Sequence, residues 1–149
     1  MLSATISYSQ EVKLVSFNEL SQIINRPDGK TKVINLWATW CKPCVEELPV
    51  FMKAVAEYGT QNTEFIFVSV DFLSQNQKVI DKVNELQMKG ILVHLNESGS
   101  DWIDKMDPDW SGAIPYTILI RPDSGRSYHY DSFANYDELK NFLDKNISH

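Results

Sequence analysis

The two cysteines of this 149-residue chain are separated by only two residues, in the run Cys41-Lys42-Pro43-Cys44. An apolar run, residues 33–40, precedes the pair, and a segment with helical spacing begins at Val45. A dithiol at the junction of a strand and a helix N-terminus lies beside unpaired N–H groups and partial positive charge, which favour the thiolate over the thiol. The arrangement therefore predicts thiol–disulfide exchange.

The elements that position this dithiol can be read from the apolar pattern. Short β-branched and apolar runs predict strands over 6–8, 12–15, 32–38, 64–71, 91–95, 116–121 and 126–130. Capping residues and helical spacing predict helices over 16–25, 43–58, 75–89, 100–106 and 135–147. Ser16 with Glu19, and Asn135 with Glu138, have the spacing of capping boxes at the first and last of these helices. Strands that alternate with helices, followed by a hairpin and a last helix, predict a mixed α/β sheet covered on both faces.

Composition sets the broad class of the protein. The chain is 43% hydrophobic and 23% charged, which is typical of one globular domain over residues 1–149 with its own core. The formal net charge of -6 argues against nucleic-acid and anionic-membrane partners. No stretch is long and apolar enough to cross a bilayer, and residues 1–10 lack the features of a signal peptide. We expect either a cytosolic protein or one whose targeting segment is absent from this chain.

A zinc site is the main alternative for a pair of closely spaced cysteines. Structural zinc needs about four ligands, and there are no further cysteines. The three histidines, His94, His129 and His149, lie far apart without ligand spacing, so we expect no metal. The position of the pair at a helix start also argues against two inert buried thiols.

Two segments resemble a known family. The run 37–44, Trp-Ala-Thr-Trp-Cys-Lys-Pro-Cys, followed by Glu47-Leu48-Pro49, resembles the active-site region of the thioredoxin superfamily, most closely the TlpA/ResA-like thiol–disulfide oxidoreductases. Downstream, residues 113–117, Ala-Ile-Pro-Tyr-Thr, resemble the cis-proline segment of that superfamily. The order of elements agrees over residues 30–147, whereas residues 1–15 match only loosely.

The resemblance implies a thioredoxin-like fold, with a mixed central sheet flanked by helices. Residues 73–110 resemble the extra helix-and-strand insert of the TlpA/ResA branch. It also implies that Cys41 is the exposed nucleophile and Cys44 the buried resolving thiol. Their positions at the helix cap and one turn further in agree with that order. Pro43 suits the first helical turn, where its missing N–H costs nothing.

Glu47 is the candidate for proton transfer. It follows Cys44 by three residues and so lies on the same helical face. A half-buried carboxylate with a raised pKa can accept the proton of the resolving thiol, and the resemblance places a functional glutamate here. The alternative is a surface glutamate stabilised by the helix dipole. Asn35 occupies the position where thioredoxin has a titratable aspartate, so we expect Glu47 alone to transfer the proton. Asn35 itself should bond to backbone or water.

Five further residues are candidates for binding the substrate. The resemblance implies a cis peptide bond before Pro115, which would leave the backbone of Ile114 free to pair with an extended substrate segment. Trp40 would border the same groove, beside Pro43. The ammonium of Lys42 either favours the neighbouring thiolate or points away into solvent.

The predicted activity needs no cofactor beyond the Cys41–Cys44 dithiol. The expected partners are protein disulfide or dithiol substrates and an upstream thiol electron donor, and we expect a monomer. The resemblance implies a reductant in the periplasm or cell envelope, with the cytoplasm as the alternative. Two other functions remain open, namely a thiol peroxidase of the same superfamily and a non-catalytic interaction module with the same fold.

Overall fold

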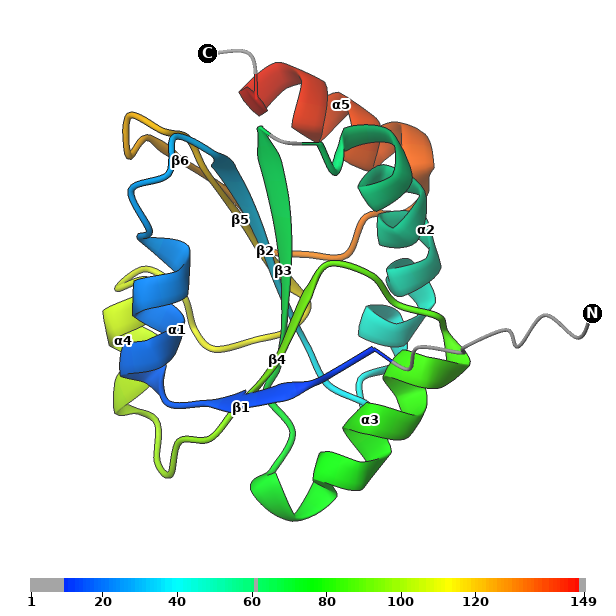
Figure 1. The fold of residues 1–149 in the computed structure, drawn as a ribbon, viewed down its shortest axis with the longest axis vertical. Helices are drawn as coiled ribbons and strands as arrows, with labels where there is room; N and C mark the ends of the chain where they lie inside the picture. The colour runs from blue at the N-terminus through cyan, green and yellow to red at the C-terminus, as the bar shows by residue number, and fades with distance from the viewer. Residues whose placement is uncertain (1–9, 61, 148–149) are drawn as a thin grey trace, which may run out of the picture.

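The computed structural model describes residues 10–60 and 62–147, so the strand predicted over 6–8 lies outside the described residues. Figure 1 shows the elements in chain order. The strands are β1 (Lys13–Val15), β2 (Thr31–Trp37), β3 (Thr63–Ser69), β4 (Ile91–Leu95), β5 (Tyr116–Ile120) and β6 (Arg126–His129). The helices are α1 (Phe17–Ile24), α2 (Lys42–Tyr58), the short 3-10 helix η1 (Leu73–Gln75), α3 (Asn76–Glu85), α4 (Asp101–Met106) and α5 (Tyr136–Ile147).

The strands form one mixed sheet in the order β1-β4-β3-β2-β5-β6. The first four strands in this order are parallel, whereas β5 runs antiparallel to β2 and β6 antiparallel to β5. This arrangement confirms the predicted mixed sheet and the predicted terminal hairpin. The register places Asn35 of β2 opposite Thr117 of β5.

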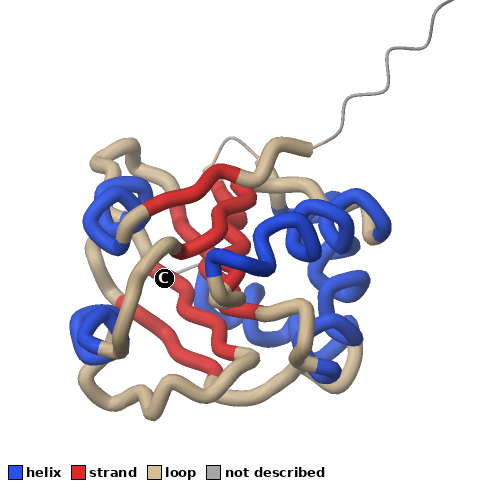
Figure 2. The backbone as a smooth tube through the Cα atoms, turned by 90° about the horizontal axis from the view of Figure 1, so that it is seen from below, coloured by secondary structure: helices blue, strands red, loops and turns tan. Residues whose placement is uncertain are grey.

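Helices cover both faces of the sheet. Helices α2, α3 and α5 lie on one face, and α1 and α4 lie on the other (Figures 1 and 2). Alternate residues of a strand point to opposite faces, and β2 follows this rule, with Val33 in one core and Ile34 in the other. Every residue of β2 is buried, as its continuous apolar run predicts. The dithiol therefore follows one of the two central strands of the sheet.

The ends of the helices follow the predicted caps with two differences. Ser16 and Glu19 form the predicted capping box of α1. At α5, Asn135 accepts from the Glu138 N–H as predicted, but the Glu138 carboxylate accepts from the N–H of Ala134 instead of that of Asn135. The helix predicted over 75–89 ends at Glu85. The prediction was too long because the apolar spacing continues to Met88, which is buried. The backbone has already left the helix at Gln87, where φ is positive, at 51°.

No helix within the described ranges combines the length and the apolarity required to span a membrane.

Candidate active site

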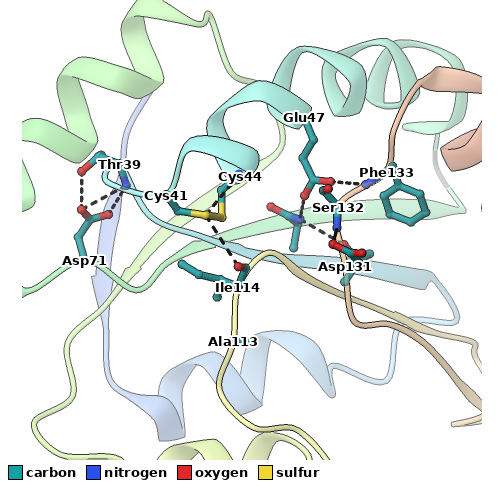
Figure 3. The surroundings of a disulfide bond; sticks show 12 residues. Thr39, Cys41, Cys44, Glu47, Asp71, Ala113, Ile114, Asp131, Ser132 and Phe133 are labelled. Atoms are coloured by element: carbon teal, nitrogen blue, oxygen red, sulfur yellow. Dashed lines mark hydrogen bonds between the residues drawn. A yellow bond between two sulfur atoms is a disulfide. The ribbon is translucent and has the colours of Figure 1, made fainter.

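Cys41 and Cys44 form a disulfide at the N-terminus of α2 (Figure 3). Cys41 is the N-cap residue, with extended backbone, and its Sγ accepts from the N–H of Cys44 at 3.3 Å. Pro43 lies in the first turn of the helix, where no N–H is needed. The predicted junction of strand, dithiol and helix is confirmed, and it aims the positive end of α2 at the Cys41 sulfur.

Both cysteines are buried in this oxidised form. Cys41 is 5% exposed and Cys44 is 0% exposed, so the expectation that Cys41 is an exposed thiol is wrong. The reason lies in the loop before β5, because the carbonyl oxygen of Ile114 lies 3.9 Å from Cys41 Sγ (Figure 3). The Ile114 side chain also packs against the core cluster that contains both cysteines. Of the two cysteines, Cys41 still has the greater access to solvent.

The loop that contacts the disulfide carries the predicted cis bond, between Ile114 and Pro115. Its approach to β5 is held by Trp110, whose indole N–H donates to the carbonyl of Ala113 at 2.8 Å. The structure therefore brings Ile114 to the dithiol from a position more than 70 residues further along the chain.

Two of the proposed substrate-binding side chains extend from the surface beside the disulfide. Trp40, directly before Cys41, is one of the most exposed large hydrophobic side chains among the described residues. The Lys42 side chain is 86% exposed, and its Nζ lies 3.8 Å from Glu46 Oε1. Lys42 thus adopts the solvated alternative, and water and Glu46 screen its effect on the sulfurs.

Glu47 lies one turn after Cys44 on the buried side of α2. It is 2% exposed, so it is neither the half-buried group expected nor the surface glutamate of the alternative. Its Oε1 accepts from Asn35 Nδ2 at 3.1 Å, and its Oε2 accepts from the N–H of Phe133 at 2.8 Å (Figure 3). Burial raises the pKa of Glu47 to about 7, although both hydrogen bonds oppose the rise. A carboxyl group with this pKa can gain or lose a proton near neutral pH.

Asn35 connects the Glu47 carboxylate to the sheet. Its Nδ2 donates to Glu47 and, at 3.2 Å, to the hydroxyl of Thr117, which faces it across the β2–β5 pair. The hydrogen bonds of Asn35 therefore go to side chains and not to the expected backbone groups, because the strand register offers it a side chain on each side. Its Oδ1 is buried and has no hydrogen-bond partner among the described residues.

Asp71 is a buried carboxylate beside the disulfide that the sequence reading missed. It accepts from the N–H of Thr39 at 3.0 Å and from the Thr39 hydroxyl at 2.5 Å (Figure 3). It also accepts from the Ser69 hydroxyl at 2.7 Å. It therefore holds the turn between β2 and Cys41. An aspartate as the last residue of the buried strand predicted over 64–71 is the only sequence signal that points to it. In the part of the chain described, no three His, Cys, Asp or Glu side chains gather as a metal site would require.

Comparison with known proteins identifies a family and a named relative for this chain. Residues 9–131 match the AhpC/TSA family. The thiol-disulfide oxidoreductase ResA of Oceanobacillus iheyensis is 27% identical over 117 residues, which cover 78% of this chain and 57% of ResA. The chain thus spans little more than half the length of that relative.

Solved structures share the thioredoxin-like fold. A secreted Mycobacterium tuberculosis disulfide oxidoreductase, described as homologous to Escherichia coli DsbE, has a TM-score of 0.61 at 18% identity, with 79% of this chain and 83% of that one covered. A thiol:disulfide interchange protein of Chlorobium tepidum has a TM-score of 0.64 at 17% identity, with 82% and 83% covered. At these identities the likeness concerns the fold.

Proposed function

Because the chain belongs to the AhpC/TSA family, we propose that it is a thiol–disulfide oxidoreductase that exchanges disulfides with protein substrates. The observation that carries this proposal is the Cys41–Cys44 disulfide at the N-terminus of α2, with the Ile114 carbonyl against it. Such a junction stabilises a thiolate at Cys41, which is the reactive species in exchange.

The proposed reaction runs through a mixed disulfide. The Cys41 thiolate attacks one sulfur of the substrate disulfide, and the other substrate sulfur leaves and takes up a proton. Cys44 then loses its proton and attacks Cys41, which releases the second substrate thiol and closes the Cys41–Cys44 bond. Two electrons pass from the protein dithiol to the substrate, and an upstream dithiol donor restores the reduced protein.

Glu47 is the proposed acceptor of the Cys44 proton. Its position one turn after Cys44 on the buried side of α2, and its pKa of about 7, support this role. Asn35 cannot titrate, so it supplies a hydrogen bond to the Glu47 carboxylate and leaves the proton to Glu47.

The proposed substrate groove is bordered by Trp40 and by the Ile114–Pro115 loop, with Pro43 and the solvent-facing Lys42 at its edge. An extended substrate segment would pair with the backbone of Ile114 beside the sulfurs. We further propose that the protein acts as a monomeric reductant outside the cytoplasm. The structural relative described as secreted supports that location, and fractionation of cells that express the full-length protein tests it.

Reduction of insulin disulfides in the presence of dithiothreitol tests the proposed function. The wild-type protein should accelerate the precipitation of the insulin B chain, and Cys41→Ser should abolish that activity. Consumption of hydrogen peroxide, measured on the same protein, tests the thiol peroxidase alternative. Activity in neither assay would favour a non-catalytic interaction module.

A further inference from the structure

A cavity of about 410 Å³ lies next to the active site, at the carboxyl ends of β3 and β4. We call it the β3–β4 pocket. It is lined by residues 70–73 after β3, residues 95–99 after β4, and residues 102–103 of α4. Ligands of open α/β sheets bind at the carboxyl ends of the strands, and this volume is within the usual range for ligand sites.

The pocket presents apolar side chains to solvent. Phe72 is 81% exposed and Leu73 is 48% exposed, and both line it. Few large hydrophobic side chains are this exposed within the described ranges, and another of them is Trp40. Thr39 and Asp71 are hydrogen-bonded to each other, and Trp40 follows Thr39 in the chain as Phe72 follows Asp71. The exposed apolar residues therefore belong to adjoining segments. Adjoining exposed apolar groups on a soluble protein mark an interaction site.

Both walls of the pocket are attached to segments that border the disulfide. On one side, the Asp71 carboxylate bonds to the turn before Cys41 through Thr39. On the other side, the side chain of Ile103 packs against Gly112. A Cβ atom on Gly112 would lie 3.0 Å from Cδ1 of Ile103. The ring of Trp102 also lies 5.7 Å from that of Trp110, which bonds to the loop before Pro115. The pocket is therefore connected to both active-site segments through these contacts.

Its charge is negative. The lining residues, all in the described part of the chain, include Asp71 and Glu97 but no lysine, arginine or histidine. The Asp71 carboxylate is buried and already accepts hydrogen bonds from three donor groups. Glu97 is exposed and accepts one, from the N–H of Phe17 at 2.7 Å. Glu97 is thus the charge that a ligand would meet, and a cation complements it.

We propose that the β3–β4 pocket binds an extended segment of the substrate polypeptide through a large apolar side chain, with a lysine or arginine beside it that faces Glu97. This inference rests on the proposed function, because it assigns the pocket to the same substrate whose disulfide reaches Cys41. The pocket would select among protein substrates, whereas a small disulfide such as oxidised glutathione would reach the sulfurs without it.

Binding of cysteine-free peptides to the oxidised protein tests this proposal by isothermal titration calorimetry. Four short peptides of one framework would carry Leu-Arg, Ser-Arg, Leu-Glu or Ser-Glu at the same two positions. The Leu-Arg peptide should bind at least about tenfold more tightly than the Ser-Glu peptide, since burial of a leucine side chain alone contributes that much. Phe72→Ser should remove the preference for leucine, and Glu97→Gln, which keeps an acceptor for Phe17, should remove only the preference for arginine.

Tyr128→Ser is the matched control, because Tyr128 is an exposed aromatic residue of β6 outside the pocket. It should bind the four peptides as the wild type does. Leu73→Ser repeats the test at a second exposed position. Equal binding of all four peptides, or the same preference in wild type and Phe72→Ser, would overturn the pocket proposal. Failure of the proposed function would appear separately, as absence of insulin reduction, because these peptides contain no disulfide.

Discussion

The N–H of Phe133 donates a hydrogen bond of 2.8 Å to Oε2 of Glu47, although the two residues are 86 positions apart. This contact joins the first turns of α2 to the segment before α5. It satisfies one oxygen of a buried carboxylate and lowers the pKa of Glu47. Burial outweighs this effect and, together with the negative charges of Asp131 and Glu138, raises that pKa to about 7. The pKa of Glu47 therefore depends on parts of the chain that lie outside the dithiol motif.

Replacement of Glu47 by Gln should slow the resolution of the mixed disulfide. Below pH 7 Glu47 of the wild type holds its proton and cannot accept another, so the wild-type rate should rise as the pH passes about 7. Glu47→Gln should lose this inflection and be slower by about 100-fold at neutral pH, which is typical of the loss of a general base. Stopped-flow release of a thiol dye bound to Cys41 measures the rate.

Glu46→Gln is the control for that experiment, since Glu46 is an exposed neighbour on the same helix. It should keep the wild-type profile. If Glu47→Gln and the wild type share one pH profile, Glu47 has no part in proton transfer.

The same carboxyl group should make stability depend on pH. In the folded protein Glu47 keeps its proton up to about pH 7, whereas in the unfolded chain an ordinary glutamate, with a pKa of 4.5, releases it at lower pH. Stability should therefore fall as the pH rises between these values, by about 3 kcal/mol from this group. Glu47→Gln should be more stable than the wild type at pH 8, by about 1–3 kcal/mol, and closer to it at low pH. Urea unfolding of the two oxidised proteins at pH 8 and at low pH measures their free energies of unfolding. The same difference in stability at both pH values would contradict this prediction.

Asn35 should lower the pKa of Glu47. Asn35→Val removes the donor to Oε1, so the charged carboxylate loses support and its pKa should move above the wild-type value. Thr117→Val breaks only the other hydrogen bond of Asn35 and should cause a smaller shift. Titration of the side-chain carboxyl carbon by nuclear magnetic resonance measures both. An unchanged or lower pKa in Asn35→Val would show that the hydrogen bond has no such effect.

Asp71 should hold the turn before Cys41. Asp71→Asn keeps the size of the side chain but removes the charge that strengthens the bonds from Thr39 and Ser69. We expect a loss of about 1–3 kcal/mol in unfolding free energy and faster hydrogen exchange at the Thr39 amide. Asp101→Asn, an exposed position in the first turn of α4, should change neither. Wild-type exchange at Thr39 in Asp71→Asn would argue against this role.

The parts of the fold that could be predicted from the sequence are those that depend on local pattern. The capping box at Ser16 and the buried run of β2 lie within a few neighbouring residues, so both were predicted correctly. Helix α3 was predicted too long, because burial of Met88 continues the apolar spacing after the hydrogen bonding has ended.

The candidate site was predictable where a motif carries it and not where distant segments meet. The spacing of Cys41 and Cys44 and their place before a helix indicate the dithiol directly. By contrast, the partner of Asn35 depends on strand register, and the bonds from Thr39 to Asp71 join the ends of two strands. The burial of Cys41 likewise depends on the Ile114 loop. No pattern within one segment contains that information.

The most direct test of the central claim is the pH dependence of alkylation of Cys41. In reduced Cys44→Ser, the rate of reaction with iodoacetamide reports the thiolate fraction of Cys41 alone. We predict a midpoint within about 3.5–7.5, well below the value of about 8.5 for free cysteine, because Cys41 caps the N-terminus of α2. A midpoint at or above that of free cysteine would contradict the account.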